Sequence, residues 1–256
     1  MEKTPGFPDL LRLIDERSTA FRAAVAAAPD LDVRVPTCPE WTLLDLVRHL
    51  GGRRRFWAAT VAAGPAAAPA EPPAENAWAA PEERDALVPW LAESTREMLD
   101  ALREAGPDRG CWTWWGASQS PKTCGAVARH QLQEIAVHTY DAQLTVGAAQ
   151  ALPEEVALDG VEEFLSTCCA TTSPWPHQSA AVDFHATEGR SWRLSLSPDG
   201  ARATRLSAPV TAADTSLRGT AGDLVLALYG RVPLDSLEVD GDGGVFGLLE
   251  AWEPEE

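Results

Sequence analysis

The sequence has little positive charge, no long apolar run and no closely spaced cysteine motif. Its 256 residues contain 21 lysines and arginines against 38 aspartates and glutamates, a formal net charge of −17 at pH 7. Such a surface repels nucleic-acid phosphates and anionic membranes, so we expect neither as a partner. No stretch approaches the roughly 18 consecutive apolar residues of a membrane span, and the first residues lack the pattern of a signal peptide. We therefore expect a cytoplasmic protein.

The cysteines argue against a disulfide framework. There are five of them, an odd number, and none forms a CxxC pair. Without a secretory signal, this pattern predicts thiols that are mostly reduced. Hydrophobic residues make up 45% of the chain and charged residues 23%, which is typical of a globular protein. The length is that of about one to two domains.

Residues 1–152 are expected to form an antiparallel four-helix bundle. Apolar side chains recur in them at the three- and four-residue spacing of amphipathic helices. The expected helices cover residues 7–28, 43–63, 81–105 and 120–147. Thr42 and Asp45 predict a capping box at the second helix, and Ser120 followed by Pro121 predicts the start of the fourth. The stretch between the second and third helices is rich in proline and alanine, so we expect a long loop there.

Residues 153–256 are expected to form a linker helix and a small α+β domain, because the apolar period changes within them. The linker helix should cover 154–171. Apolar and polar residues then alternate in a way that predicts a small antiparallel sheet. The alternating stretches are 182–186, 192–197 and 200–206. Thr220 begins a further helix, and a last short helix is expected over 245–252. The whole chain is thus predicted to be α+β.

Three side chains on the expected bundle helices have the chemistry of a metal site. Glu134 and His138 are four residues apart, so they project from the same helix face, and His49 on the second helix can face them across the bundle. Two imidazoles and a carboxylate suit zinc or another divalent first-row metal, and three protein ligands leave a position open for water or substrate. A solvated or core pair without metal is the alternative that the spacing leaves open.

Four neighbouring residues have roles that spacing alone leaves open. His130, one turn before the glutamate, fits a ligand, a group that contacts a ligand, or a surface residue. Asp141, three residues after the second histidine, fits a carboxylate that orients the imidazole or a solvated helix-end acid. Arg53, one turn after the first histidine, could attract an anionic substrate or a thiol, or it could belong to a solvated basic face. Cys38 fits a nucleophile or a packed turn residue.

Three segments resemble the signature segments of the mycothiol-dependent maleylpyruvate isomerase family. They are TCPEWTLLDLVRHLGG (37–52), CWTWWG (111–116) and QEIAVHTYDAQ (133–143). The resemblance implies a DinB-like bundle that holds a divalent metal, usually zinc, on His49, Glu134 and His138. It also implies a small SCP2-like second domain, to which the segment DLVLALYGRVPL is similar. In this family an arginine of the C-terminal domain assists substrate binding or catalysis, and Arg231 is the better match, ahead of Arg218.

These features predict a two-domain metalloenzyme that is either a mycothiol-dependent isomerase or a thiol S-transferase. A thiol at the open metal position, most naturally mycothiol, would have a lowered pKa, and its thiolate would add to a small electrophilic substrate. One alternative is a hydrolase that activates water with help from Glu134 or His130. Another is a non-catalytic protein whose second domain holds a small apolar molecule or lipid. The sequence departs from the family by having Gln133 where a histidine is frequent. A monomer or small homo-oligomer is expected.

Overall fold

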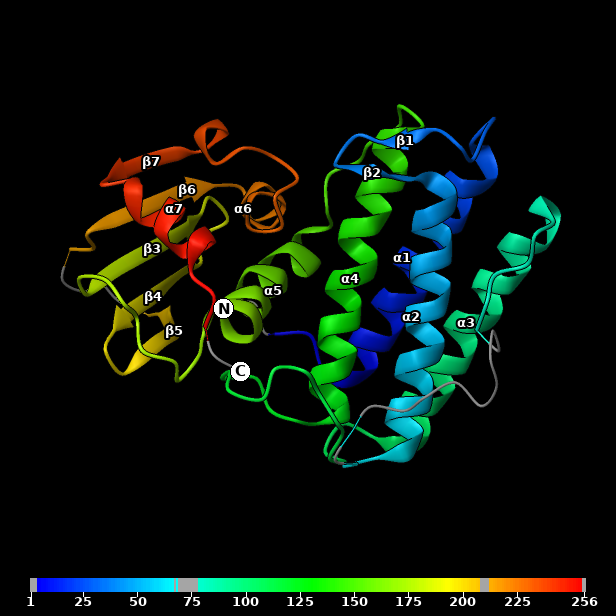
Figure 1. Cartoon of the computed structure of the whole chain (residues 1–256), viewed down its shortest axis with the longest axis horizontal. Coiled ribbons are helices and arrows are strands. Elements are labelled where there is room, and N and C mark those ends of the chain that lie inside the picture. Colours follow the sequence, from blue (N-terminus) through cyan, green and yellow to red (C-terminus); the bar gives the residue numbers. More distant parts are fainter. Residues whose placement is uncertain (1–3, 67, 69–77, 208–211, 255–256) are drawn as a thin grey trace. The chain divides into compact units, whose positions relative to one another are not determined.

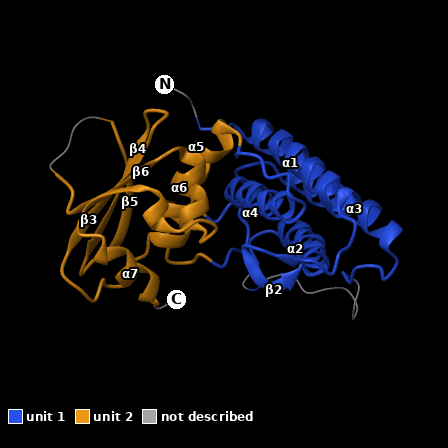
Figure 2. Ribbon diagram, turned by 90° about the horizontal axis from the view of Figure 1, so that it is seen from above, with its two compact units in different colours: residues 1–114, 122–152 blue, residues 115–121, 153–256 orange. Residues whose placement is uncertain are grey.

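The computed structural model describes residues 4–66, 68, 78–207 and 212–254, and the chain folds into two compact units. The first unit comprises Met1–Trp114 and Lys122–Leu152, and the second comprises Trp115–Pro121 and Pro153–Glu256 (Figure 2). The predicted α+β class, with helices first and a sheet afterwards, is confirmed. No helix within the described ranges is long and apolar enough to cross a membrane.

Four long helices build the first unit (Figure 1). They are α1 (Phe7–Ala27), α2 (Leu43–Ala63), α3 (Arg84–Ala105) and α4 (Cys124–Thr145). Helix α1 packs mainly against α4, and α2 packs mainly against α3. Two short strands, β1 (Arg34–Val35) and β2 (Cys38–Thr42), form an antiparallel pair just before α2. The core of the unit contains the fully buried Ile14, Phe21, Leu46, Trp57, Met98 and Leu132.

Helix α2 begins where the sequence predicts. The Thr42 hydroxyl accepts a hydrogen bond from the backbone N–H of Asp45, and the Asp45 carboxylate accepts one from the backbone N–H of Thr42 at 2.9 Å. This reciprocal pair satisfies two N–H groups that would otherwise lack partners at the first turn. Gly64 ends the helix with a φ of +75°, a conformation that glycine adopts without strain. The whole predicted range of α2 is confirmed.

Helix α4 begins later than predicted. We expected Ser120 to cap it, but Thr123 does so, and its hydroxyl accepts from the backbone N–H of Ala126 at 3.3 Å. The reason is non-local. The backbone N–H of Cys124 donates to the carbonyl of Arg109, and further bonds of this kind pair the residues before the helix with the chain around 107–111. The Lys122 carbonyl accepts from the backbone N–H of Cys111, so it is not available for the i to i+4 bond of a helix that starts at Ser120.

The connection before α3 is only partly described. Most of the predicted loop, residues 67 and 69–77, lies outside the described residues. The described remainder contains no helix, and α3 begins at Arg84, three residues later than expected.

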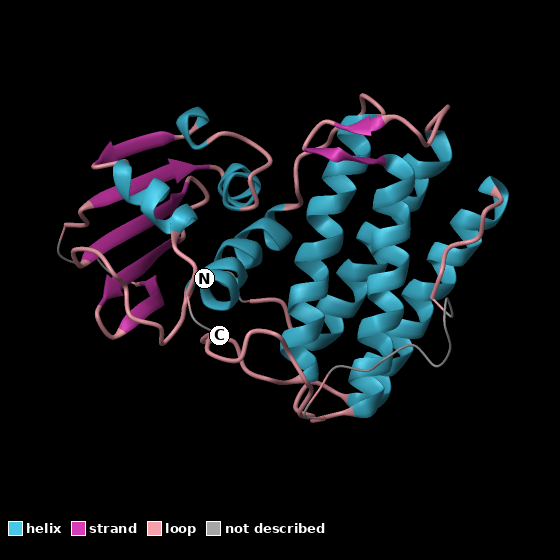
Figure 3. Ribbon diagram, viewed as in Figure 1, coloured by secondary structure: helices cyan, strands magenta, loops and turns pink. Residues whose placement is uncertain are grey.

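A five-stranded sheet forms one layer of the second unit (Figure 3). Its strands are β3 (Ala180–Ala186), β4 (Ser191–Ser197), β5 (Gly200–Leu206), β6 (Thr215–Gly219) and β7 (Glu238–Gly241), in the spatial order β5-β4-β3-β6-β7. The predicted antiparallel run β3-β4-β5 is confirmed, with Val182 opposite Leu194. Outside this run β6 pairs with β3 in parallel, so the five-stranded sheet is mixed.

Helices complete the second unit. They are α5 (Glu154–Phe164), α6 (Ala221–Leu228) and α7 (Gly244–Ala251), with a short 3-10 turn over Leu234–Ser236. The predicted linker helix is α-helical only to Phe164 and continues as a π-helical turn over Leu165–Cys169. Helix α6 packs against α5, and Thr220 caps α6 as predicted. The core of this unit contains Val182, Phe184, Trp192, Leu194, Leu217 and Leu224.

Candidate metal centre

The structure brings three predicted ligand side chains together in the first unit. His49 lies on α2, and Glu134 and His138 lie one turn apart on α4. One ligand atom from each lies within 4.8 Å of the others. His49 Nε2 is 2.9 Å from Glu134 Oε1, and His138 Nε2 is 3.7 Å from the same oxygen. Within the described part of the chain, this is the only group of three or more histidine, cysteine or acidic side chains arranged in this way.

The three side chains are covered but remain accessible to solvent. The exposed fractions are 27% for His49, 22% for Glu134 and 10% for His138. A closed structural metal site is normally sealed by a fourth protein ligand, whereas a catalytic site keeps one position for water or substrate. Partial exposure and three donors fit the second type.

Asp141 holds His138 in place. Its carboxylate is 2.8 Å from His138 Nδ1, and its other oxygen accepts a hydrogen bond from the Thr37 hydroxyl at 2.6 Å. Asp141 is completely buried, so it is not the solvated helix-end acid that the spacing also allowed. A carboxylate on Nδ1 favours the tautomer with its proton there, which leaves the Nε2 lone pair available to a cation.

Trp41 forms an aromatic wall beside the two histidines. The centroid of its ring is 4.8 Å from that of His49 and 6.3 Å from that of His138, and the second pair is stacked. Sequence reasoning did not single out Trp41. Its place at the end of β2, directly before α2, is the only signal that pointed to it, because this segment also carries the first histidine.

The environment of Glu134 keeps this carboxylate charged. Burial disfavours the anion, but the hydrogen bond with His49 and the positive charges of His138, His49 and His130 outweigh that cost. Together they lower the Glu134 pKa to about 2. A carboxylate that is ionised at neutral pH and flanked by two imidazoles is a donor set that suits a divalent cation. The residues therefore fit a metal ion.

Comparison with known proteins agrees with the three sequence segments. A family model described as the mycothiol maleylpyruvate isomerase N-terminal domain matches residues 11–143, and the model of the corresponding C-terminal domain matches residues 155–248. This chain belongs to the mycothiol maleylpyruvate isomerase family. The family predicted from the sequence is confirmed, and with it the prediction of an enzyme.

Two solved structures share the fold of this family member. A crystal structure of the mycothiol-dependent maleylpyruvate isomerase aligns with a TM-score of 0.57, and that of a histidine-to-alanine mutant aligns with 0.58. Each is 15% identical in sequence and covers 94% of this chain and 96% of the other. At this identity the likeness concerns the fold. No curated protein sequence matches the chain.

The three-ligand group of this isomerase-family protein does not include the other predicted site residues His130, Arg53 and Arg231. His130 is on α4 and its ring contacts Trp57 and Trp114, with centroids 6.5 and 5.6 Å away. Arg53 is exposed on α2, and its guanidinium carbon lies 4.8 Å from the centre of the Phe56 ring. Arg231 belongs to the second unit.

Proposed function

We propose that this protein is a divalent-metal-dependent enzyme that uses a low-molecular-weight thiol, mycothiol by its family, to isomerise a small electrophilic substrate. The observation that carries the proposal is the convergence of His49, Glu134 and His138 within 4.8 Å in a chain of this family. The matched structures bear the name of a mycothiol-dependent isomerase, which supports thiol-dependent isomerisation. Transfer of the thiol to the substrate is the second outcome of the same chemistry.

The protein side chains have distinct parts in this proposal. His49, Glu134 and His138 would hold the metal, for which zinc is the leading candidate. When bound, such an ion lowers the pKa of a thiol or water that it coordinates. Asp141 keeps His138 oriented and in the required tautomer. Trp41 covers one side of the histidines and restricts the access of water to them.

Two arginines are proposed to recognise anionic groups. Arg53 is exposed and lies one turn after His49 on the same helix, where it would attract an acidic substrate or the thiol. Arg231 is proposed as the second-unit residue that assists the substrate, as the family resemblance implies. In a chain with a net charge of −17, local cations of this kind counter the repulsion of an anionic substrate.

Elemental analysis of the purified protein tests the metal first. We expect about one divalent ion per chain in the wild-type protein and its loss in His49→Ala, Glu134→Gln and His138→Ala. His185→Ala is the matched control, because His185 lies on β3 of the second unit and pairs with Ser191. Full occupancy in all three ligand variants would show that the assignment is wrong.

Turnover assays then separate the chemical alternatives. The metal-loaded protein is mixed with a cis-unsaturated diacid, with and without mycothiol, and products are resolved by chromatography. The proposal expects isomerised acid only in the presence of thiol, and a stable thioether adduct would instead indicate S-transfer. Hydrolysis of an ester or amide substrate without any thiol would favour the hydrolase and contradict the proposal.

A further inference from the structure

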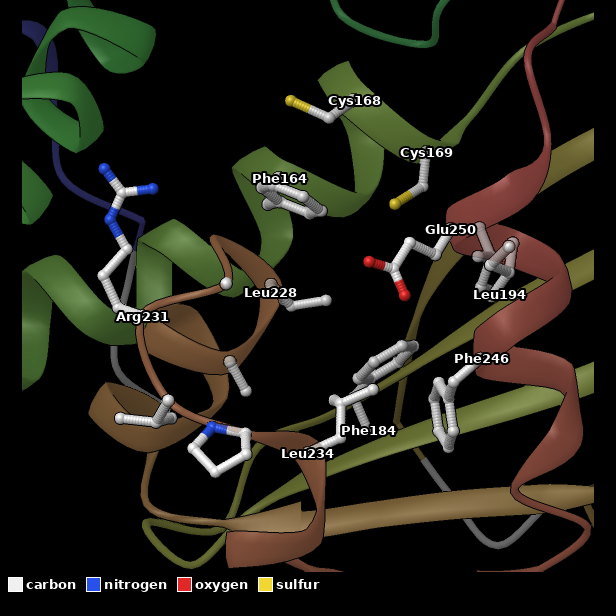
Figure 4. A pocket seen from close by; sticks show the side chains of 15 residues that line it. Phe164, Cys168, Cys169, Phe184, Leu194, Leu228, Arg231, Leu234, Phe246 and Glu250 are labelled. Atoms are coloured by element: carbon white, nitrogen blue, oxygen red, sulfur yellow. The ribbon is translucent and has the colours of Figure 1, made fainter. Parts of the chain in front are cut away.

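The second unit contains a cavity that is lined by none of the three proposed metal ligands. It has a volume of about 640 Å³, within the usual range for sites that bind small molecules. Its walls come from the end of α5 and the π-helical turn, from strands β3 and β4, and from helices α6 and α7 (Figure 4). Every residue that lines it belongs to the second unit.

Three phenyl rings dominate the walls. Phe164 comes from α5, Phe184 from β3 and Phe246 from α7, and Leu194 and Leu228 add aliphatic surface. Phe184 is almost completely buried, whereas Phe164 and Phe246 are half-buried. Rings drawn from three separate elements make an apolar enclosure for a flat or aliphatic body.

Glu250 introduces a single acidic group among these apolar side chains. Its carboxylate points toward the interior of the cavity (Figure 4). Among the residues that the structure describes, none pairs with this carboxylate by an ion pair or a hydrogen bond. Glu250 is exposed to solvent, so its unpaired carboxylate can receive a cationic group that enters the cavity.

The other polar groups of the cavity do not neutralise Glu250. Arg231 lies on the opposite side of the lining with its guanidinium directed away from the carboxylate (Figure 4), and it donates to the Tyr229 carbonyl at 2.7 Å. Burial and the nearby Glu163 raise the pKa of the Cys169 thiol to about 12, so this thiol is neutral at physiological pH. The cavity therefore combines apolar walls with the Glu250 carboxylate on one side and the Arg231 guanidinium on the opposite side.

We infer that this cavity binds a small apolar molecule that carries a protonated amine. The apolar body would pack against Phe164, Phe184 and Phe246, and the ammonium group would meet the Glu250 carboxylate. Faces of phenyl rings also attract a cation, and the overall negative charge of the chain raises the local concentration of cations. The inference does not depend on the metal, because none of the three proposed ligands lines the cavity, although the cavity shares Arg231 with the proposed substrate site.

Titration with three fluorescent probes of different charge tests the inference on the full chain. The probes are dansylcadaverine, which carries an amine, neutral N-phenylnaphthylamine, and anionic anilinonaphthalene sulfonate. We expect one equivalent of dansylcadaverine to bind about tenfold or more tightly than the sulfonate, since one charge-assisted contact is worth at least that factor. Equal affinity for all three, or no binding of the amine, would overturn the inference.

Paired variants locate the binding site. Glu250→Gln should lower the affinity for the amine about tenfold and leave that for the neutral probe unchanged. Because Glu250 is exposed on α7, this variant should fold normally. Glu238→Gln removes the same charge from an exposed position on β7 that does not line the cavity, and it should change neither affinity.

Two further variants complete the test. Phe246→Ala should weaken the binding of both the amine and the neutral probe, because it removes one of the three rings. His49→Ala should leave all three affinities unchanged even if it abolishes turnover. If Glu250→Gln and Glu238→Gln reduce amine binding equally, the probe is responding to general surface charge and the inference fails.

Discussion

Replacing Gly51 with alanine should destabilise the first unit, although alanine normally favours a helix. Gly51 is buried on α2. A Cβ atom added there would lie 1.9, 2.1 and 2.7 Å from three carbons of the Trp90 ring on α3, far inside normal contact distance. The ring cannot move freely, because the Arg55 guanidinium stacks over it at 4.6 Å and also bonds to the Trp90 carbonyl at 3.2 Å.

The expected magnitude follows from two opposing effects. Replacing a helical glycine with alanine normally raises the free energy of unfolding by about 1 kcal/mol. Overpacking costs about 1–3 kcal/mol, and displacement of the Trp90 ring loses a cation–π contact worth about 0.5–1 kcal/mol. Gly51→Ala should therefore lower the free energy of unfolding by about 0.5–3 kcal/mol, which corresponds to about 1–12 °C in Tm.

The next residue supplies the matched control. Gly52 lies in the same helix, but a Cβ there would meet only the Trp78 carbonyl oxygen at 4.0 Å. Gly52→Ala should consequently stabilise the protein by up to about 1 kcal/mol. Urea unfolding followed by circular dichroism measures both variants. The packing argument would be refuted if Gly51→Ala were as stable as Gly52→Ala, or if Trp90→Leu failed to reduce the cost of the Gly51 substitution.

Three further predictions follow from individual contacts. Asp141→Asn should weaken metal binding about 10–100-fold, because it perturbs the contact that orients His138. Competition with a chelator measures the metal affinity, and an unchanged affinity would contradict the role of Asp141. Burial raises the pKa of the Cys169 thiol to about 12, so its alkylation rate in the folded protein should keep rising up to about pH 12 instead of levelling near pH 9. The raised pKa also makes protein stability depend on pH. The contribution of this thiol to the free energy of unfolding is fully present below pH 9 and is lost between pH 9 and about 12. Peptide-resolved iodoacetamide kinetics test this, and a plateau near pH 9 would contradict it. Arg193→Ala should lower the free energy of unfolding by about 3 kcal/mol, because it removes the two hydrogen bonds of 2.6 and 2.8 Å that Arg193 donates to the buried Asp183 carboxylate. The control is Arg202→Ala at an exposed position of β5. It should change the free energy of unfolding by no more than about 0.5 kcal/mol.

Local interactions explain what could be predicted about the helices. The capping box of α2 involves residues three positions apart, and all of its hydrogen bonds lie within the first turn of the helix. Glu134 and His138 share a face of α4 for the same reason, since helical geometry alone places residues four apart next to each other. The start of α4 was missed, because backbone pairing with a segment more than ten residues earlier prevents Ser120 from capping the helix.

In the sheet, too, the pairing between strands that are close in the sequence could be predicted, and the pairing between distant strands could not. Strands β3, β4 and β5 follow one another through short turns, so their alternation and order predict an antiparallel run. Strands β6 and β7 are short, and β7 is exposed along its whole length, so their apolar pattern is weak. Their pairing, including the parallel contact of β6 with β3, depends on the path of the chain between distant segments.

By itself the sequence determined the helical bundle, the change to an α+β second half, the family and the candidate ligands, because each depends on local periodicity or on recognisable short segments. Only the tertiary structure decided that His49 meets Glu134 across 85 positions of the chain, that Trp41 covers the histidines and that Asp141 is buried against His138. It alone brought three phenylalanines and Glu250 around one cavity. The physical reason is that such contacts arise from packing between distant segments, and no local period of the sequence records which segments will pack together.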